Sequence, residues 1–141
     1  MNNETYTIFN FSRFEKLEEL IIGNDCFRRV NTFVIDGLNY LKSLKIGMNS
    51  FTKKRNNSGD DKTRSFQILN CVELESIEIY RFSFSDYSGG FELFNLPKLS
   101  TIKIGSIETD YSDSNNGGRS FNFAVSSFEI KGIIMFIMID E

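Results

Sequence analysis

Hydrophobic residues recur along the chain in a fixed frame. The clearest copy runs from Phe33 to Ile46 and reads F-x-I-x-x-L-x-x-L-x-x-L-x-I. Matching frames begin at five phenylalanines: Phe9, Phe33, Phe66, Phe91 and Phe128. The starts lie 24, 33, 25 and 37 residues apart, so the basic unit has 24 or 25 residues. Internal repetition with this period indicates one domain, residues 1–141, built from about four and a half stacked repeats.

Each repeat carries two short strand signals. Leu44 and Ile46 flank a lysine, and Phe66 and Ile68 flank a glutamine. Alternation with a period of two is typical of a strand with one buried face. The three-residue steps between the intervening leucines favour a tight bend. We therefore expect a mainly β solenoid with stacked parallel strands. The alternative is an α/β solenoid with short helical turns on its convex side.

Two repeats are longer than the others because they contain polar, turn-rich insertions at 52–65 and 106–120. Both are expected to be solvent-exposed loops, which in solenoids often form a binding edge. The alternative is a pair of loops with no binding role. The candidate contact residues of the insertions are Lys53, Lys54, Arg55, Tyr111 and Asp113. The other charged residues of the first insertion are Asp60, Asp61, Lys62 and Arg64.

The L-x-x-L-x-I signal with its 24-residue period resembles a leucine-rich repeat. Residues 68–79 are similar to the C-x-x-L-x-S-I-x-I core of the BspA-like subclass. The resemblance covers residues 9 to about 139 and implies a curved solenoid used for protein or carbohydrate contacts and adhesion. The chain departs from the pattern at Gly47 and Gly105, where proline is usual. It also has no steady asparagine column, since that position reads Asp25, Asn49, Phe82 and Ile107.

The outward positions of the L-x-I strands form a second candidate binding surface. Register should place Lys45 beside Glu78 and Glu78 beside Lys103, with Lys42 beside Glu75. The alternative is that these charges only satisfy one another, because opposite charges on neighbouring strands attract weakly. No tyrosine, tryptophan or arginine is expected in these columns, although such residues dominate binding hot spots.

Composition removes most catalytic and metal chemistry. The chain has no histidine and only two cysteines, so imidazole bases and four-cysteine zinc sites are excluded. Cys71 falls in a core column and Cys26 in a different one, so no disulfide is expected. The net charge of −3 argues against nucleic acid as a partner. We expect a chain that is not an enzyme and has no catalytic residue, metal or cofactor.

The C-terminal segment is unusually apolar. The frame places Ile133, Phe136 and Ile139 inward, and four further apolar residues outward: Ile134, Met135, Ile137 and Met138. An apolar edge strand is a template for pairing with another chain. Three explanations fit this apolar C-terminal segment. The chain is a fragment of a longer repeat array, or two copies pair through this edge, or the segment folds over the last repeat as a cap.

The sequence shows no signal peptide and no run of about 20 apolar residues, which a membrane-spanning helix needs. The cell interior is therefore the default location, and the cell surface is the alternative if the chain is part of a longer protein. The favoured function is a non-catalytic protein-protein interaction or adhesion module with an unidentified protein partner. The alternative is a structural segment of a larger array without binding activity of its own.

Overall fold

A computed structural model describes residues 8–54, 59–105, 121, 128–131 and 136–140, the last two ranges as backbone. Every regular element among them is a strand. The strands are β1 (Ile8–Asn10), β2 (Glu19–Ile22), β3 (Thr32–Asp36), β4 (Ser43–Ile46), β5 (Ser65–Leu69), β6 (Ser76–Tyr80), β7 (Gly90–Phe94), β8 (Thr101–Gly105), β9 (Phe128–Lys131) and β10 (Phe136–Asp140). The mainly β expectation is confirmed, and the described residues form no helical turns of the alternative kind.

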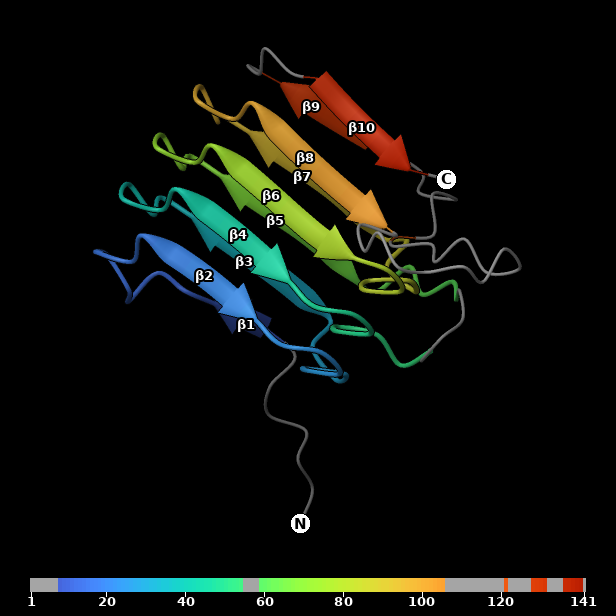
Figure 1. The fold of residues 1–141 in the computed structure, drawn as a ribbon. Coiled ribbons are helices and arrows are strands. Elements are labelled where there is room, and N and C mark those ends of the chain that lie inside the picture. The colour runs from blue at the N-terminus through green and yellow to red at the C-terminus, as the bar shows by residue number, and fades with distance from the viewer. Residues whose placement is uncertain (1–7, 55–58, 106–120, 122–127, 132–135, 141) are drawn as a thin grey trace.

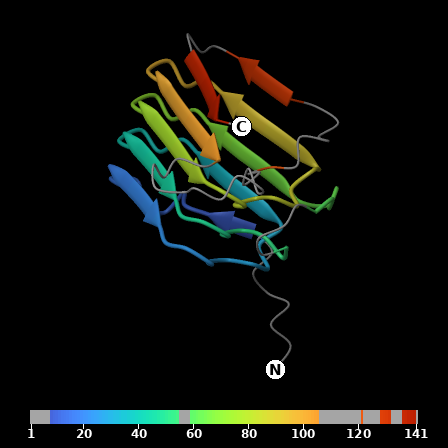
Figure 2. The same ribbon diagram turned by 45° about the vertical axis from the view of Figure 1, so that its right-hand side comes forward.

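The strands form two parallel sheets that face each other (Figures 1 and 2). Odd-numbered strands make one sheet in the order β1-β3-β5-β7-β9, and even-numbered strands make the other in the order β2-β4-β6-β8-β10. Each repeat therefore contributes one strand to each sheet. The five expected repeat starts occupy a single register position in the odd sheet: Phe9, Phe33, Phe66, Phe91 and Phe128.

The core lies between the sheets because the inward positions of both are apolar. In β3, Phe33 and Ile35 are fully buried, and in β4 Leu44 and Ile46 are at most 1% exposed. Each inward column stacks identical or similar side chains from successive repeats. Burial of this kind supplies most of the stability of a repeat, since one repeat alone has nothing to pack against.

Two bends join the sheets, and they differ in length. The first bend connects an odd strand to the following even strand at 11–18, 37–42, 70–75 and 95–100. The second bend connects an even strand to the following odd strand at 23–31, 47–64, 81–89 and 106–127. The connection of β9 to β10 at 132–135 is also a first bend, so the first bends are four to eight residues long, whereas the second bends range from nine to 22 residues. Both insertions therefore fall in second bends by their place in the sequence. The described ends of β2, β4, β6 and β8, where the second bends begin, lie toward the right-hand side of Figure 1.

Phenylalanines fill the interior beside the second bends. Four of them stack with ring centroids 4.7–5.1 Å apart: Phe27, Phe51, Phe84 and Phe121. The phenylalanines at the repeat starts form a second column of rings. Rings of the two columns pack edge to face, as Phe66 and Phe84 do with centroids 4.9 Å apart. Offset and edge-to-face ring pairs stabilise beyond their buried area. The four stacked residues have φ between 55° and 57°, an unusual region for a bulky side chain.

An amide ladder runs along the first bends. Asn95 Nδ2 donates to Asn70 Oδ1 at 2.9 Å, and Asn70 Nδ2 donates to Asp36 Oδ1 at 2.9 Å. Both asparagines have φ near 54°, which asparagine tolerates better than most residues. The column of Asn49, at the second bends, has no steady asparagine. The ladder lies at the first bends instead.

The register of β10 corrects the expected phase of the C-terminal segment. Ile137 pairs with Ile102, so it takes the inward register position that the frame assigned to Ile139. Ile139 pairs with Ile104 and keeps an inward register position, whereas Phe136 pairs with Thr101 at an outward position. The reason is spacing: nine residues separate Phe128 from Ile137, whereas 11 separate Phe91 from Ile102. Ile134 and Met135 lie outside the described residues.

None of the described segments is a helix long and apolar enough to cross a membrane.

Candidate functional site

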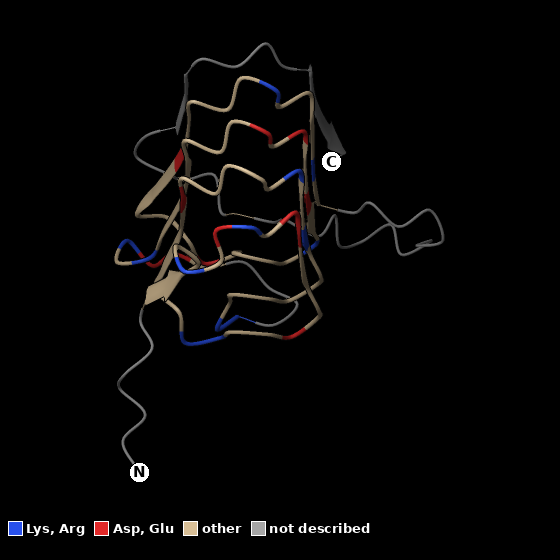
Figure 3. Cartoon of the chain, turned by 90° about the vertical axis from the view of Figure 1, so that its left-hand side faces the viewer, with Lys and Arg blue, Asp and Glu red and all other residues tan. Residues whose placement is uncertain are grey.

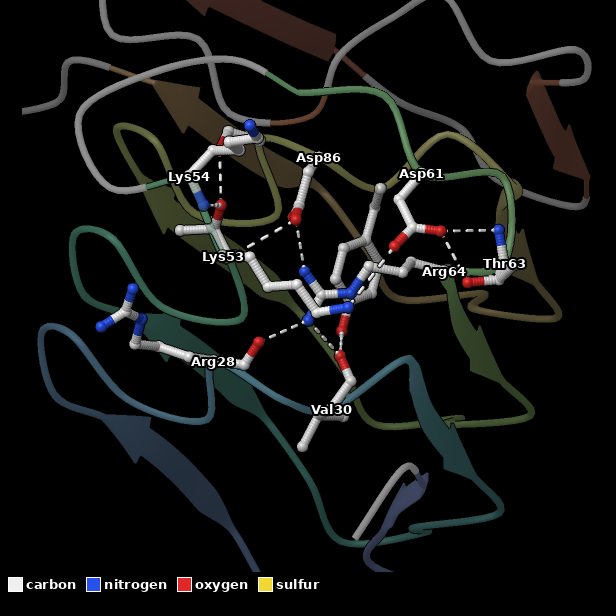
Figure 4. A network of polar contacts seen from close by, with 11 residues as sticks. Arg28, Val30, Lys53, Lys54, Asp61, Thr63, Arg64 and Asp86 are labelled. Atoms are coloured by element: carbon white, nitrogen blue, oxygen red, sulfur yellow. Dashed lines mark hydrogen bonds and ion pairs between the residues drawn. The ribbon is translucent and has the colours of Figure 1, made fainter. Parts of the chain in front are cut away.

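The first insertion is anchored to the core by a buried arginine. Arg64 is fully buried, and its Nη1 lies 2.6 Å from Asp86 Oδ2 (Figure 4). Its Nη2 donates to the backbone carbonyls of Arg28, at 2.7 Å, and Val30, at 2.6 Å. One side chain therefore ties together the second bends of three successive repeats. The expectation that 52–65 is a solvent-exposed loop is wrong for Arg64, and also for Thr52, which is buried against the next bend.

Tyr87 completes this anchor. The Arg64 guanidinium lies 4.7 Å from the centroid of the Tyr87 ring, and the tyrosine hydroxyl donates to the carbonyl of Val30 at 2.5 Å. Burial raises the pKa of the Tyr87 phenol, so the hydroxyl keeps its proton and remains a donor. We name Arg64, Asp86 and Tyr87 the clasp. It holds charge where a purely apolar core would be expected.

A buried ion pair of this kind fixes geometry more than it adds stability. Desolvation of both charges offsets most of their attraction, and removing one partner leaves the other uncompensated. Among the described residues, Arg64 Nε and Asp86 Oδ1 have no hydrogen-bond partner, which adds to that cost. The clasp therefore makes the position of the insertion depend on an intact pair.

The returning arm of the insertion adds backbone pairing to the next repeat. The amide of Gly59 donates to the carbonyl of Ser85 at 3.1 Å, and that of Asp61 to the carbonyl of Asp86 at 2.9 Å. Asp61 also forms a parallel β-bridge with Tyr87. The outgoing arm is fixed by Thr52, whose Oγ1 lies 2.8 Å from Ser85 Oγ. Both described arms are thus bonded to residues 85–88.

Basic side chains surround the clasp on the outside. We name the exposed residues Arg28, Arg29, Lys53, Lys54 and Lys62 the basic rim. Asp61 offsets part of its charge, because Lys53 Nζ lies 3.7 Å from Asp61 Oδ2. Burial alone would raise the pKa of Asp61, but hydrogen bonds from Thr63, with Lys53 and Arg64 nearby, hold it below its usual value. Arg55, Tyr111 and Asp113 lie outside the described residues.

The strand face has the predicted register but a different set of partners. Lys45, Glu78 and Lys103 stand side by side on β4, β6 and β8. Lys103 Nζ lies 4.0 Å from Glu78 Oε1, whereas Lys45 lies over the ring of Tyr80, 5.2 Å from its centroid. Tyr80 ends β6, one residue beyond the L-x-I signal, so the repeat pattern does not include it.

Lys42 lies beside Glu75 as predicted, since the amide of Glu75 donates to the carbonyl of Lys42 at 2.9 Å, but the ion pair of Lys42 is with another residue. Lys42 Nζ forms its ion pair with Glu18 of the preceding repeat at 2.9 Å, and this hydrogen bond raises the pKa of Lys42. Glu75 acts on it only as a more distant charge. The pair is exposed at both ends, so it contributes little to stability.

The two cysteines lie in separate columns and are free thiols. Cys71 is buried in the core, and burial raises its pKa to about 11, so it is protonated at neutral pH. The amide of Cys26 donates to Ser50 Oγ at 3.2 Å, as expected for a residue in the Ser50 column. In the parts of the chain that the structure describes, no three His, Cys, Asp or Glu side chains are grouped to hold a metal.

The clasp is the feature that sequence reasoning missed. Its arginine lies in a polar, turn-rich insertion, whose composition predicts exposure to solvent. One available signal was the repeated hydroxyl flank in Ser50-Phe51-Thr52 and Ser83-Phe84-Ser85, which marks a polar interior beside the phenylalanine column.

Comparison of the chain with protein-family models, with curated proteins and with solved structures gives no match.

Proposed function

We propose that this chain is a non-catalytic interaction or adhesion module of the leucine-rich-repeat type, close to the BspA-like subclass. The fold assignment is supported by the L-x-x-L-x-I frame and by the two parallel sheets to which each repeat contributes one strand. Its contact surface is the basic rim, with the strand face of Lys45, Glu78 and Lys103 as a secondary surface. The partner is a protein.

The clasp is the observation that carries this proposal. Arg64 and Asp86 hold the arms of the insertion in place, so the backbone that carries the described cations of the rim has a fixed position. Lys53 and Lys54 are exposed, while their amides donate to Asp86 Oδ2 at 3.2 Å and Thr52 Oγ1 at 3.0 Å. A preorganised loop loses less conformational entropy on binding than a free one. Cations on such a loop suit an acidic surface of a partner.

The test compares two charge-reversal variants of the full chain as bait. Lys53→Glu/Lys54→Glu alters the basic rim, and Lys45→Glu/Lys103→Glu alters the strand face by the same formal charge. Proteins retained from the native source are quantified by mass spectrometry at matched bait folding, checked by circular dichroism. We expect an acidic protein that wild type and the strand-face variant retain and the rim variant loses.

Two results count against the rim as the contact surface. One is retention of the same proteins at the same levels by wild type and the rim variant. The other is loss in the strand-face variant alone, which transfers the contact to Lys45 and Lys103. Since long-range attraction between charges is screened by salt, the retained amount should also fall between 50 mM and 500 mM salt.

A structural segment of a larger array is the second candidate. The first repeat favours it, because Phe14 and Phe27 are exposed where later repeats bury the same columns. Immunoblotting of the native product decides this point. A native mass well above 16.3 kDa supports the segment, and a stable native species of 16.3 kDa contradicts it.

A further inference from the structure

The first repeat leaves much of its core side uncovered. Five of its inward side chains are exposed or half-buried, whereas their counterparts one repeat later are at most 1% exposed. The uncovered residues are Phe9, Phe14, Leu17, Leu20 and Phe27, and their counterparts are Phe33, Leu38, Leu41, Leu44 and Phe51. We name the five uncovered residues the end face. The corresponding side chains of the fourth repeat, such as Leu96 and Leu99, stay buried.

Two strand edges border the end face. β1 pairs only with β3, and β2 only with β4, among the described strands. Their outer edges therefore present backbone donors and acceptors beside an apolar surface, the combination that favours pairing with another chain. An occupant must supply two strands and apolar side chains between them.

Residues 1–7 by themselves are too few to supply two strands. One repeat spans 14 residues from Phe9 to the end of β2 at Ile22. A second copy of the chain, in contrast, carries two strand edges and an apolar face of matching width. Closed two-fold pairs are also the commonest form of self-association.

The charges around the end face suit a two-fold copy. Residues 11–22 hold two basic and three acidic side chains, a net charge of −1. Residues 23–31 hold two arginines and one aspartate, a net charge of +1. A two-fold axis in the plane of the face and perpendicular to the strands places each segment over the other segment of the second copy. Opposite charges then meet at both ends.

We propose that the end face is a homotypic interface through which two copies form a closed dimer. In this dimer β1 pairs antiparallel with its own copy, β2 does the same, and Phe27 of one copy packs against Phe14 of the other. The inference shares Arg28 and Arg29 with the basic rim, but its apolar contacts and its partner, a second copy of the chain, are different.

The test is the solution mass of the full chain, by light scattering and sedimentation at several concentrations. The end-face variant Phe14→Lys/Phe27→Asn is compared with a control, Tyr40→Lys/Phe94→Asn. Exposure is matched, because Phe14 and Tyr40 are 59% and 56% exposed, and Phe27 and Phe94 are both 41% exposed. Asparagine also tolerates the φ of 57° at Phe27. We expect wild type and control at twice 16.3 kDa, and a dissociation constant raised about 100-fold in the end-face variant.

Several outcomes overturn the proposal. A wild-type monomer removes the interface, and a dimer unaffected by the end-face variant places it elsewhere. Loss of the dimer in Met138→Lys alone moves it to the C-terminal edge, and masses beyond a dimer indicate head-to-tail stacking. If the end-face variant does not fold, hydrogen exchange of wild type decides. Protection of β1 and β2 amides that rises with protein concentration supports the dimer, and its absence contradicts it.

Discussion

The two bends of each repeat solve the same problem in different ways. The first bends are short and nearly uniform, and their polar contacts lie at the surface: the ion pair of Lys98 with Glu73 and the amide ladder at Asn70. In the second to fourth repeats these bends carry basic, acidic and basic side chains in turn, whereas the first bend of the first repeat carries both signs (Figure 3). The second bends vary in length and bring their polar groups inside, where Arg64, Asp86 and Ser83 are buried.

This difference shows how a repeat tolerates insertions. A bend of fixed length can rely on the next identical bend, so weak exposed contacts are enough to align it. A bend that changes length loses that neighbour and needs specific partners for the backbone groups that it buries. Buried hydroxyl, carboxylate and guanidinium groups supply these partners at the second bends. Polar contacts should therefore matter far more at the second bends than at the first.

The largest expected contrast is between two ion pairs of equal length. The N–O distance is 2.6 Å both for Arg64–Asp86 and for Lys98–Glu73, but Arg64 is fully buried and Lys98 is half exposed. Arg64→Ala should lower the free energy of unfolding by about 3–5 kcal/mol, because it leaves Asp86 buried without its counter-ion. Lys98→Ala should lower it by less than about 1 kcal/mol. Urea unfolding measures both, and similar losses would show that the two bends do not differ in this way.

Serines offer a smaller contrast of the same kind. The amide of Ser50 donates to Ser83 Oγ at 3.1 Å, and the hydroxyl of Ser83 donates to the carbonyl of Gly47. Ser83→Ala should lower the free energy of unfolding by about 1–3 kcal/mol, since it leaves two buried polar groups unsatisfied. Ser100→Ala at a first bend should change it by less than about 0.5 kcal/mol, because Ser100 is exposed. Equal effects in thermal unfolding would contradict the comparison.

The amide ladder tests whether the first bends depend on backbone conformation or on side-chain bonds. Asn70 has a φ of 54°, so Asn70→Ala strains the backbone and removes the bonds to Asp36 and Asn95. Asn70→Gly removes the same bonds without the strain. We expect Asn70→Ala to be less stable than Asn70→Gly by about 1 kcal/mol in urea unfolding. No difference between the two would assign the role of Asn70 to its side-chain bonds.

The strand positions of the first four repeats were predictable from sequence because they depend on the period of apolar residues. Phe66 pairs with Phe91, and Ile77 with Ile102, as the frame requires. Period-two alternation specifies register strongly, since a shift by one residue would expose every core side chain. The phase failed at Ile137 because the bend before it is shorter, and a fixed frame cannot detect a change in bend length.

The clasp was not predictable in the same way. The burial of Arg64 depends on Asp86, which lies 22 residues away in another bend, and on carbonyl groups near Val30. Composition places an arginine among lysines and aspartates at the surface, where such residues are usually found. Only the three-dimensional meeting of successive second bends creates the environment in which this arginine is stable.

The smallest expected effect is a difference between the two bends in how their contribution to stability depends on pH. Asp61 of the second bend has a lowered pKa in the folded chain, so its ionised form stabilises the fold above its unfolded value of 3.8. That contribution is lost as the pH falls through the lowered folded value. Asp61→Asn should therefore be less stable than wild type at pH 7 by less than about 1 kcal/mol, since the side chain is partly exposed. The difference should shrink toward pH 2.

A control variant tests whether the hydrogen bond from Thr63 causes this pH effect. The hydroxyl of Thr63 donates to Asp61 Oδ1 at 2.6 Å, so Thr63→Ala should reduce the acid-dependent part of the stability without removing the carboxylate. Lys42 of the first bend has a raised pKa, so its contribution is present below its unfolded value of 10.5 and lost at higher pH. Acid should therefore weaken the second bend and alkali the first. A gap between wild type and Asp61→Asn that is equal at pH 7 and pH 2 would contradict this assignment.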